Sequence, residues 1–192
     1  SPGRVTRGTV DTLFSPLSVQ GPMARNVPDL ALFLDTMAGF CPTDPLTFDA
    51  PPIPFFEAVR TERSPRRVAY AETIGQSPVD KETREICRAA MKTFEALGAA
   101  VEEIRIDIPD VENTFLALRS QQFVIDRELQ LQSHRDKIKP DIIWNTEIGL
   151  KQSISDLAAA ERGRTALYRQ FADLFNQYDL IVTPGANTPA FD

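Results

Sequence analysis

A strand, a helix and a second strand, joined by short loops, form the most restrictive pattern in this sequence. Residues 67–71 (RVAYA) predict a strand that ends where Gly, Ser and Pro residues follow it. Asp80 is a typical helix N-cap and Gly98 a typical helix stop, so a helix is expected between them. Residues 101–107 (VEEIRID) then alternate apolar and polar side chains, which predicts a half-exposed strand.

This pattern predicts a βαβ unit at about 67–107. One stripe of its helix is expected to be apolar, and it consists of Ile86, Ala90, Phe94 and Leu97. A connection of this kind is right-handed, and its two strands lie in one sheet, where the parallel arrangement is favoured. We therefore expect an α/β fold.

Residues 1–25 show neither the period of a strand nor that of a helix, because Gly and Pro residues interrupt them. They predict loops with one short strand at 17–20. A helix of about three turns follows. Asn26 is its expected N-cap, Asp29 is the capping partner, and Gly39 ends it.

Proline is concentrated in residues 42–54 (PTDPLTFDAPPIP). Each proline removes an amide donor and fixes φ, so this stretch cannot hold a helix or a central strand. It predicts a crossing segment or a linker.

The second half of the chain predicts mostly helices. Apolar residues at helical spacing indicate a long helix over 110–132, and residues 133–152 are expected to be irregular around Pro140. A further helix is expected to open at Ser155–Asp156. Residues 180–183 (LIVT) have the length and the β-branched content of a buried strand.

Composition limits the class of protein. Hydrophobic residues make up 42% and charged residues 25%, so the chain can bury a core and is not expected to be disordered. The net charge is −6, and the few arginines between 60 and 67 indicate a solvated loop rather than a nucleic-acid surface. No apolar run approaches the roughly 18 residues of a membrane span. Cys41 and Cys87 lie far apart, which favours two free thiols in a reducing cytosol over a disulfide or a metal site.

The residues alone indicate no self-sufficient active site. His134 is the only histidine, and its polar neighbours at the end of a predicted helix favour an exposed side chain over a general base. Lys151 would need burial or a cationic neighbour to act as an activated amine, and the sequence indicates neither. The acidic residues at 102–103 and 107–112 flank strands and caps, so solvated turns explain them better than a metal site.

Residues 16–39 (PLSVQGPMARNVPDLALFLDTMAG) resemble the segment that closes the core of the amidase signature family. These serine hydrolases cleave carboxamide C–N bonds. The opening SPGRVTRG is similar to the family stretch just after the Gly/Ser-rich signature. Residues 140–150 (PDIIWNTEIGL) and 161–191 follow in the family's order, so the resemblance covers essentially the whole chain.

The family uses a Lys, a Ser held by a cis peptide and a nucleophilic Ser. The resemblance places all three upstream of the position where this chain begins, and Ser15 and Ser18 fit neither serine role. It therefore implies no catalytic residue in this chain, no metal and no organic cofactor. The chain by itself is expected to be inactive.

The resemblance also divides the chain into three parts. Residues 1–41 are the end of the signature core, 42–66 are the Pro-rich crossing segment, and 67–192 are an α/β region that covers the active site and is incomplete at its C-terminal end. Gly21, Pro22 and Arg25 are a structural motif of the first part. They are expected to pack against the signature core.

Four residues are candidate substrate contacts in this resemblance: Trp144, Asn145, Thr183 and Pro184. The Trp144 side chain offers a broad apolar wall with one N–H donor. A core aromatic is the alternative for Trp144, and a structural role at a strand end is the alternative for Thr183.

Two classes of function remain open. The first is a fragment of a cytoplasmic amidase that hydrolyses a small-molecule amide to a carboxylic acid and ammonia or an amine, without nucleic acid or membrane. An amidotransferase subunit of the same family is its variant. The second is a truncated binding or assembly module, whose exposed core-facing surface docks a partner or a second copy of the chain.

Overall fold

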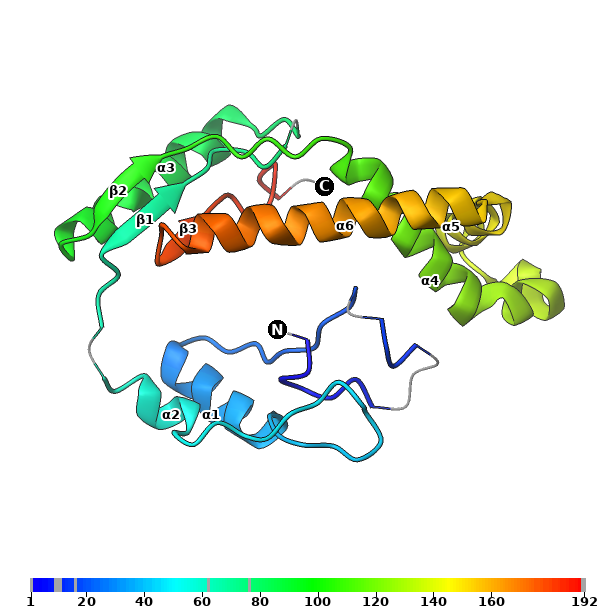
Figure 1. Cartoon of the computed structure of the whole chain (residues 1–192), viewed down its shortest axis with the longest axis horizontal. Helices are drawn as coiled ribbons and strands as arrows, with labels where there is room; N and C mark the ends of the chain where they lie inside the picture. The colour runs from blue at the N-terminus through cyan, green and yellow to red at the C-terminus, as the bar shows by residue number, and fades with distance from the viewer. Residues whose placement is uncertain (1, 9–11, 16, 62, 76, 191–192) are drawn as a thin grey trace. The chain divides into compact units, whose positions relative to one another are not determined.

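The computed structural model describes residues 2–8, 12–15, 17–61, 63–75 and 77–190 (Figure 1). The chain forms two compact units. Unit 1 consists of residues 1–62 and 118–152, and unit 2 consists of residues 63–117 and 153–192. Each unit is therefore assembled from two separate stretches of the sequence. The three-part division drawn from the resemblance remains a prediction.

Unit 2 contains a sheet of three parallel strands (Figure 1). These are β1 (Arg67–Tyr70), β2 (Ala100–Glu103) and β3 (Leu180–Val182), in the order β2-β1-β3. Val68 of β1 lies opposite both Val101 and Leu180. The α/β fold and the parallel pairing of the two predicted strands are confirmed.

The predicted strand at 101–107 is too long. Regular pairing of β2 with β1 ends at Glu103, and beyond it Ile106 makes an isolated parallel bridge with Ile74. The alternation extends further because Ile106 is buried, with 1% of its surface exposed. The buried Ile106 therefore continues the alternation of apolar and polar residues beyond the last paired residue of β2.

Helix α3 (Lys81–Ala96) connects β1 and β2, and both predicted ends are confirmed. The Asp80 carboxylate accepts a hydrogen bond from the Glu82 backbone N–H at 2.9 Å. Gly98 follows the helix with a φ of +88°, a left-handed conformation that favours glycine.

The predicted apolar stripe of α3 is only partly right, since Phe94 is half-buried but Ala90 is exposed. Ile86 and Leu97 are exposed, whereas Met91 is the buried residue of the helix. Two overlapping apolar rows run along this helix, and the row nearer the sheet contains Cys87 and Met91. Periodicity alone cannot choose between adjacent rows.

The core of unit 2 centres on β1 and the residue after it, because residues 68–71 are essentially inaccessible to solvent. Helix α3 packs against β1 and β2. The other buried apolar residues of the unit are Met91, Ala99, Ile106, Ala160 and Tyr178.

The predicted long helix is confirmed as α4 (Val111–His134), which a 3-10 turn η1 (Arg135–Lys137) follows. The prediction that residues 133–152 are irregular is wrong, because they contain helix α5 (Pro140–Lys151). Pro140 occupies the first turn, where its missing N–H has no helical partner to lose. It therefore begins a helix rather than breaking one.

Helix α6 (Ile154–Phe175) starts earlier than predicted. Its N-cap is Ser153 rather than Ser155. The Ser153 hydroxyl accepts from the Asp156 N–H at 3.2 Å, and the Asp156 carboxylate accepts from the Ser153 N–H at 2.9 Å. These two bonds form a reciprocal capping box.

In unit 1, helix α1 (Val27–Met37) begins at the predicted cap. Asn26 Oδ1 accepts from the Asp29 N–H at 2.9 Å, while Asn26 Nδ2 donates to the Asp29 carboxylate at 2.8 Å. The capping pair is confirmed, and Gly39 follows the helix with a φ of +144°.

Short helix α2 (Phe55–Ala58) follows the Pro-rich segment and packs against α1. The Asp35 carboxylate of α1 accepts from the Phe55 and Phe56 N–H groups at 2.7 and 2.9 Å. This carboxylate satisfies two of the free donors at the start of α2. Residues 42–54 themselves contain neither helix nor strand, as predicted.

The short strand predicted at 17–20 is wrong. These described residues pair with no other segment as a strand, and Val19 is largely exposed. An isolated antiparallel bridge joins Val5 to Ala38 instead.

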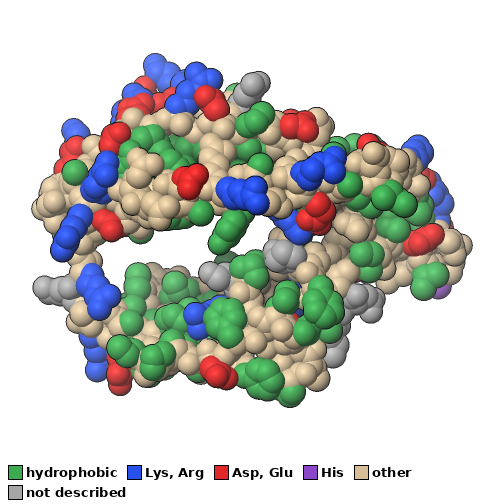
Figure 2. Space-filling view, viewed as in Figure 1, with side chains coloured by type: hydrophobic (Ala, Val, Ile, Leu, Met, Phe, Trp, Pro, Cys, Tyr) green, Lys and Arg blue, Asp and Glu red, His purple; other side chains and the backbone are tan. Residues whose placement is uncertain are grey.

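Unit 1 leaves many large apolar side chains exposed, and Figure 2 shows hydrophobic side chains gathered over its part of the face in view. In residues 12–61 they are Phe14, Val19, Met23, Val27, Leu32, Phe33, Phe40, Phe48, Ile53 and Val59. None of the helices in the described part of the chain combines the length and apolar composition that a bilayer span requires.

Candidate functional site

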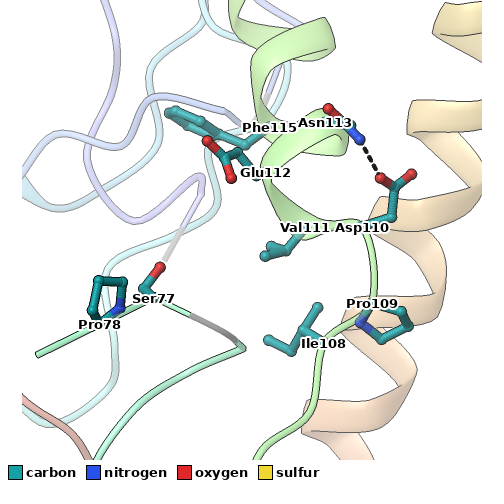
Figure 3. A pocket seen from close by; sticks show the side chains of 9 residues that line it. All are labelled: Ser77, Pro78, Ile108, Pro109, Asp110, Val111, Glu112, Asn113 and Phe115. Carbon is teal, nitrogen blue, oxygen red and sulfur yellow. Dashed lines mark hydrogen bonds between the residues drawn. The ribbon is translucent and has the colours of Figure 1, made fainter.

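A groove of about 780 Å³ opens in unit 2 where the loops after β1 and β2 meet the start of α4 (Figure 3). Its volume is in the usual range of small-molecule sites. Its lining residues are Ser77, Pro78, Ile108, Pro109, Asp110, Val111, Glu112, Asn113 and Phe115.

The turn at Asp110 shapes one wall of the groove. Asp110 has a φ of +59°, and it is the only described residue other than glycine with a positive φ. Its carbonyl oxygen accepts from the Thr114 N–H at 3.0 Å, and its carboxylate accepts from Asn113 Nδ2 (Figure 3). These bonds offset the cost of the left-handed conformation at the beginning of α4.

The lining of the groove combines apolar and acidic residues. Ile108, Val111 and Phe115 supply apolar surface, while Asp110 and Glu112 supply carboxylates and no Lys or Arg lines it. Both carboxylates lie at a helix N-terminus, where the helix dipole favours negative charge. The lining suits a neutral or cationic organic group better than an anion.

The lining residues do not form a catalytic constellation by themselves. Ser77 is the only hydroxyl nucleophile in the lining, and no His or Lys accompanies it as a base. The groove therefore fits a binding surface rather than a reacting centre.

Thr183 and Pro184 follow β3 directly, and both are half-buried. They lie at the carboxyl edge of the parallel sheet, as do the loops that line the groove. The Asp80 N–H donates to the Asn187 carbonyl at 2.7 Å, which ties the segment after β3 to the segment after β1. Ligands of parallel sheets commonly bind at this edge.

Trp144 and Asn145 are neighbours on α5 in unit 1, with opposite environments. Trp144 is 54% exposed, and the choice between a substrate contact and a core aromatic remains a prediction. Asn145 is 4% exposed. Its Nδ2 donates to the Asp141 carbonyl at 2.7 Å, while its Oδ1 is buried and has no partner among the described residues.

A close helix contact holds this part of α5. A Cβ atom added to Gly149 would lie 2.4 Å from the Ser120 carbonyl oxygen of α4, so glycine permits the approach. Ser120 is fully buried, and so is Thr146, whose hydroxyl donates to the Ile142 carbonyl at 2.8 Å. The backbone at Asn145 is therefore fixed by packing on α4.

The four predicted substrate contacts thus divide between the units, with Trp144 and Asn145 in unit 1 and Thr183 and Pro184 in unit 2. Their assembly into one pocket remains a prediction. The groove itself was not predicted, because it depends on two loops that are about thirty residues apart in the sequence. The only local sequence signal for the groove was the pair of turn residues Pro109 and Asp110.

The structural motif predicted in residues 21–25 lies at the surface of unit 1. Gly21 and Arg25 are exposed and Pro22 is half-buried. A Cβ atom at Gly21 would meet no atom within 4 Å. Packing of this motif against another polypeptide segment remains a prediction.

Neither His134 nor Lys151 lies in a setting that would make it a base or an amine nucleophile. His134 is the last residue of α4 and is exposed, with Nδ1 2.8 Å from the Ser133 hydroxyl, as predicted for a helix-end side chain. Lys151 ends α5 and is exposed. Cys41 and Cys87 are free thiols, and a hydrogen bond from Thr43 lowers the pKa of the first. In the described ranges no three His, Cys, Asp or Glu residues are grouped as metal ligands would be.

A family model and a similar curated sequence both carry the name amidase. The family model named Amidase matches residues 1–192. A Pseudomonas putida protein named amidase is 27% identical over 190 residues, covering 98% of this chain and 41% of its own length. A glutamyl-tRNA(Gln) amidotransferase subunit from Shouchella clausii is 27% identical over 216 residues, covering 98% of this chain and 44% of its own length.

A solved structure of a bacterial aryl acylamidase of the amidase signature family has the same fold. It covers 100% of this chain with a TM-score of 0.83 and 21% identity, and the match takes up 42% of its own chain. The present chain therefore spans less than half the length of the relatives it matches.

Proposed function

The chain belongs to the amidase family, and on that premise we propose that it forms part of an enzyme that hydrolyses a carboxamide C–N bond. The reaction converts an amide and water into a carboxylic acid and ammonia or an amine. The observation that carries the proposal is the match of the family along all 192 residues, together with a groove at the carboxyl edge of the sheet.

The residues of this chain would bind the amide rather than attack it. The exposed face of Trp144 offers an apolar wall for an aryl or alkyl group. Asn145, the next residue of α5, would reach an amide only after a side-chain rearrangement, because its Oδ1 is buried. Thr183 and Pro184 remain candidate contacts of their own at the carboxyl edge of the sheet in unit 2.

A nucleophile with an adjacent base, and donors for the oxyanion, are needed to complete an amide hydrolase. The described residues of the groove include a hydroxyl, Ser77, but no His or Lys as its base. We therefore expect the 192-residue chain alone to bind amides without turning them over.

One experiment tests turnover. The purified chain is incubated with acetanilide and with propanamide, and aniline or ammonia is measured. No release above buffer is expected. Release that a serine-directed fluorophosphonate abolishes would show a complete nucleophilic site and would contradict this assignment of roles.

A second experiment tests binding. Trp144 is the only tryptophan, so its fluorescence reports on α5 directly. Titration with acetanilide should give a saturable change in emission, whereas sodium benzoate should not, because the acid has no amide N–H. Absence of a saturable change with any carboxamide would contradict the proposal.

Amide transfer is the second candidate. The Shouchella clausii relative, whose name is that of an amidotransferase component, matches 98% of this chain, and several similar relatives carry the same name. Such an enzyme would release ammonia from an amide donor and pass it to an acceptor instead of to water. Ammonia release that requires an added acceptor would favour this candidate.

A further inference from the structure

The groove at the start of α4 has a lining that the four predicted substrate contacts do not share. Its lining residues all belong to unit 2, and they border one continuous space of about 780 Å³. Trp144 and Asn145 lie in unit 1, and neither they nor Thr183 and Pro184 line the groove. Those four contacts therefore do not determine what the groove binds.

Glu112 and Phe115 place a carboxylate and an aromatic ring on the same side of the groove. They lie one helical turn apart in α4, so their side chains share one face of the helix. In Figure 3 both side chains extend from α4 toward the same side. Phe115 is 51% exposed, so part of its ring is open to a ligand. A carboxylate and an accessible aromatic ring both attract positive charge.

The cations of the neighbouring segments are paired with other acids. Arg105, on the loop that leads to the groove, donates to the Asp107 carboxylate at 2.7 Å. Arg84, in the first turn of α3, donates to the Glu72 carboxylate at 2.8 Å. No Lys or Arg lines the groove, and Glu112 has no such partner among the described residues. Its negative charge is therefore not neutralised by a basic side chain.

The rest of the lining adds a second carboxylate and apolar surface. The Asp110 carboxylate accepts from Asn113 Nδ2, a neutral donor, so this bond does not cancel its charge. Ile108 and Val111 are half-buried and line the groove beside it. The groove thus combines negative charge with apolar contacts for a hydrocarbon group.

We propose that the groove binds a small organic cation, in which an ammonium group is attached to an aryl or alkyl body. The ammonium group meets the Glu112 carboxylate and the Phe115 ring, while the body covers Ile108 and Val111. This inference goes beyond the proposed function, because it holds whether or not the chain takes part in amide hydrolysis.

Binding to the purified 192-residue chain tests the preference for a cation. Three ligands of similar size are titrated by calorimetry at low ionic strength: 2-phenylethylammonium, 2-phenylethanol and 3-phenylpropanoate. The cation should bind at least about fivefold more tightly than the alcohol, because the carboxylate and the ring each contribute. The anion should bind most weakly. Methylammonium, which carries the charge without an apolar body, should give no measurable heat of binding.

Glu112→Gln assigns the preference to the groove, because it removes the charge with little change of shape. It should weaken binding of 2-phenylethylammonium about three- to fivefold and leave binding of 2-phenylethanol unchanged. Glu95→Gln is the matched control, since Glu95 is exposed on α3 in unit 2 and does not line the groove. The circular dichroism spectra of both variants should match that of the wild type.

Four results would overturn the inference. They are equal affinity for the cation and the alcohol, tighter binding of the anion, the absence of binding by all three aromatic ligands, and an equal loss of cation affinity in Glu112→Gln and Glu95→Gln. Saturable binding of acetanilide reported by Trp144 would leave the proposed function intact in each of these cases. Cation binding without any response of Trp144 to carboxamides would contradict the proposed function alone.

Discussion

Asp179 and Arg67 exchange two hydrogen bonds although they lie 112 positions apart in the sequence. The Asp179 carboxylate accepts from the Arg67 N–H at 2.9 Å, and the Asp179 N–H donates to the Arg67 carbonyl at 2.9 Å. The same carboxylate oxygen accepts from the Arg66 N–H at 2.7 Å. Asp179 thereby aligns the first residue of β3 with the first residues of β1.

Replacement of Asp179 should destabilise unit 2. Asp179→Ala removes the acceptor of two backbone N–H groups at the entry to the sheet, and we expect Tm to fall by about 4–8 °C. Thermal unfolding followed by circular dichroism measures the change. Asp173→Ala is the control, because Asp173 is exposed on α6. An equal effect of both variants would contradict the alignment role.

The same residue predicts a pH dependence. The backbone hydrogen bonds from Arg67 and Arg66 hold the pKa of Asp179 below its usual value. A carboxyl whose pKa is lower in the folded state stabilises it above its unfolded pKa of about 3.9, and this contribution disappears as pH falls through the folded value. The difference in Tm between the wild type and Asp179→Ala should therefore shrink below about pH 4. A difference that grows towards acid pH would be inconsistent with this sign.

The close contact at Gly149 predicts a steric effect. An alanine Cβ would lie 2.4 Å from the Ser120 backbone oxygen, which cannot move without shifting α4. Gly149→Ala should therefore destabilise the protein by about 1–3 kcal/mol despite the better helix propensity of alanine. Urea denaturation measures the free energy of unfolding.

Gly163 provides the comparison. The nearest atom to an added Cβ at this position is the Thr114 hydroxyl, which belongs to a side chain. Thr114→Ala should therefore rescue Gly163→Ala, whereas no side-chain truncation should rescue Gly149→Ala fully. Equal tolerance of both alanines would show that the helices are less closely packed than described.

The capping box at the start of α6 predicts a loss of helix stability. Ser153→Ala removes the acceptor for the Asp156 N–H and should cost about 1 kcal/mol. Ser155→Ala is the control, because the structure gives Ser155 no capping role. Urea denaturation of the two variants separates them, and a larger loss from Ser155→Ala would favour the helix start predicted from the sequence.

The exposed indole of Trp144 predicts a specific effect on ligand binding. Trp144→Ala should weaken acetanilide binding by up to about tenfold, while Trp144→Phe should retain most of it, because ring stacking contributes about 0.5–1.5 kcal/mol. Equilibrium dialysis measures both variants. Tyr168→Ala is the aromatic control, since Tyr168 is 75% exposed in unit 2. Unchanged binding by Trp144→Ala would remove this residue from the site.

Elements with local chemical signals were predictable from the sequence. Asn26, Asp80 and Gly98 marked helix ends through their own hydrogen bonds or backbone angles, and the structure confirms each. Pro140 was misinterpreted because the same ring that breaks a helix interior also suits a first turn. The choice depends on whether a helix begins there, which the proline alone does not reveal.

Contacts between segments that are distant in the sequence were harder to predict. The exposure of Ile86 in place of Met91 depends on which face of α3 meets β1, and both rows satisfy the helical period. The groove at Asp110 forms only when separate loops reach the same edge of the sheet. No spacing within one segment could indicate either result.

The strand order β2-β1-β3 has a consequence for biosynthesis. The central strand emerges from the ribosome long before its partner β3, so one side of β1 stays unpaired while residues 71–179 are translated. During that interval, Val68 and Ala69 lie on an unpaired strand edge that other polypeptides can pair with. Chaperone binding, or cleavage by cellular proteases, should therefore concentrate on chains arrested before Leu180.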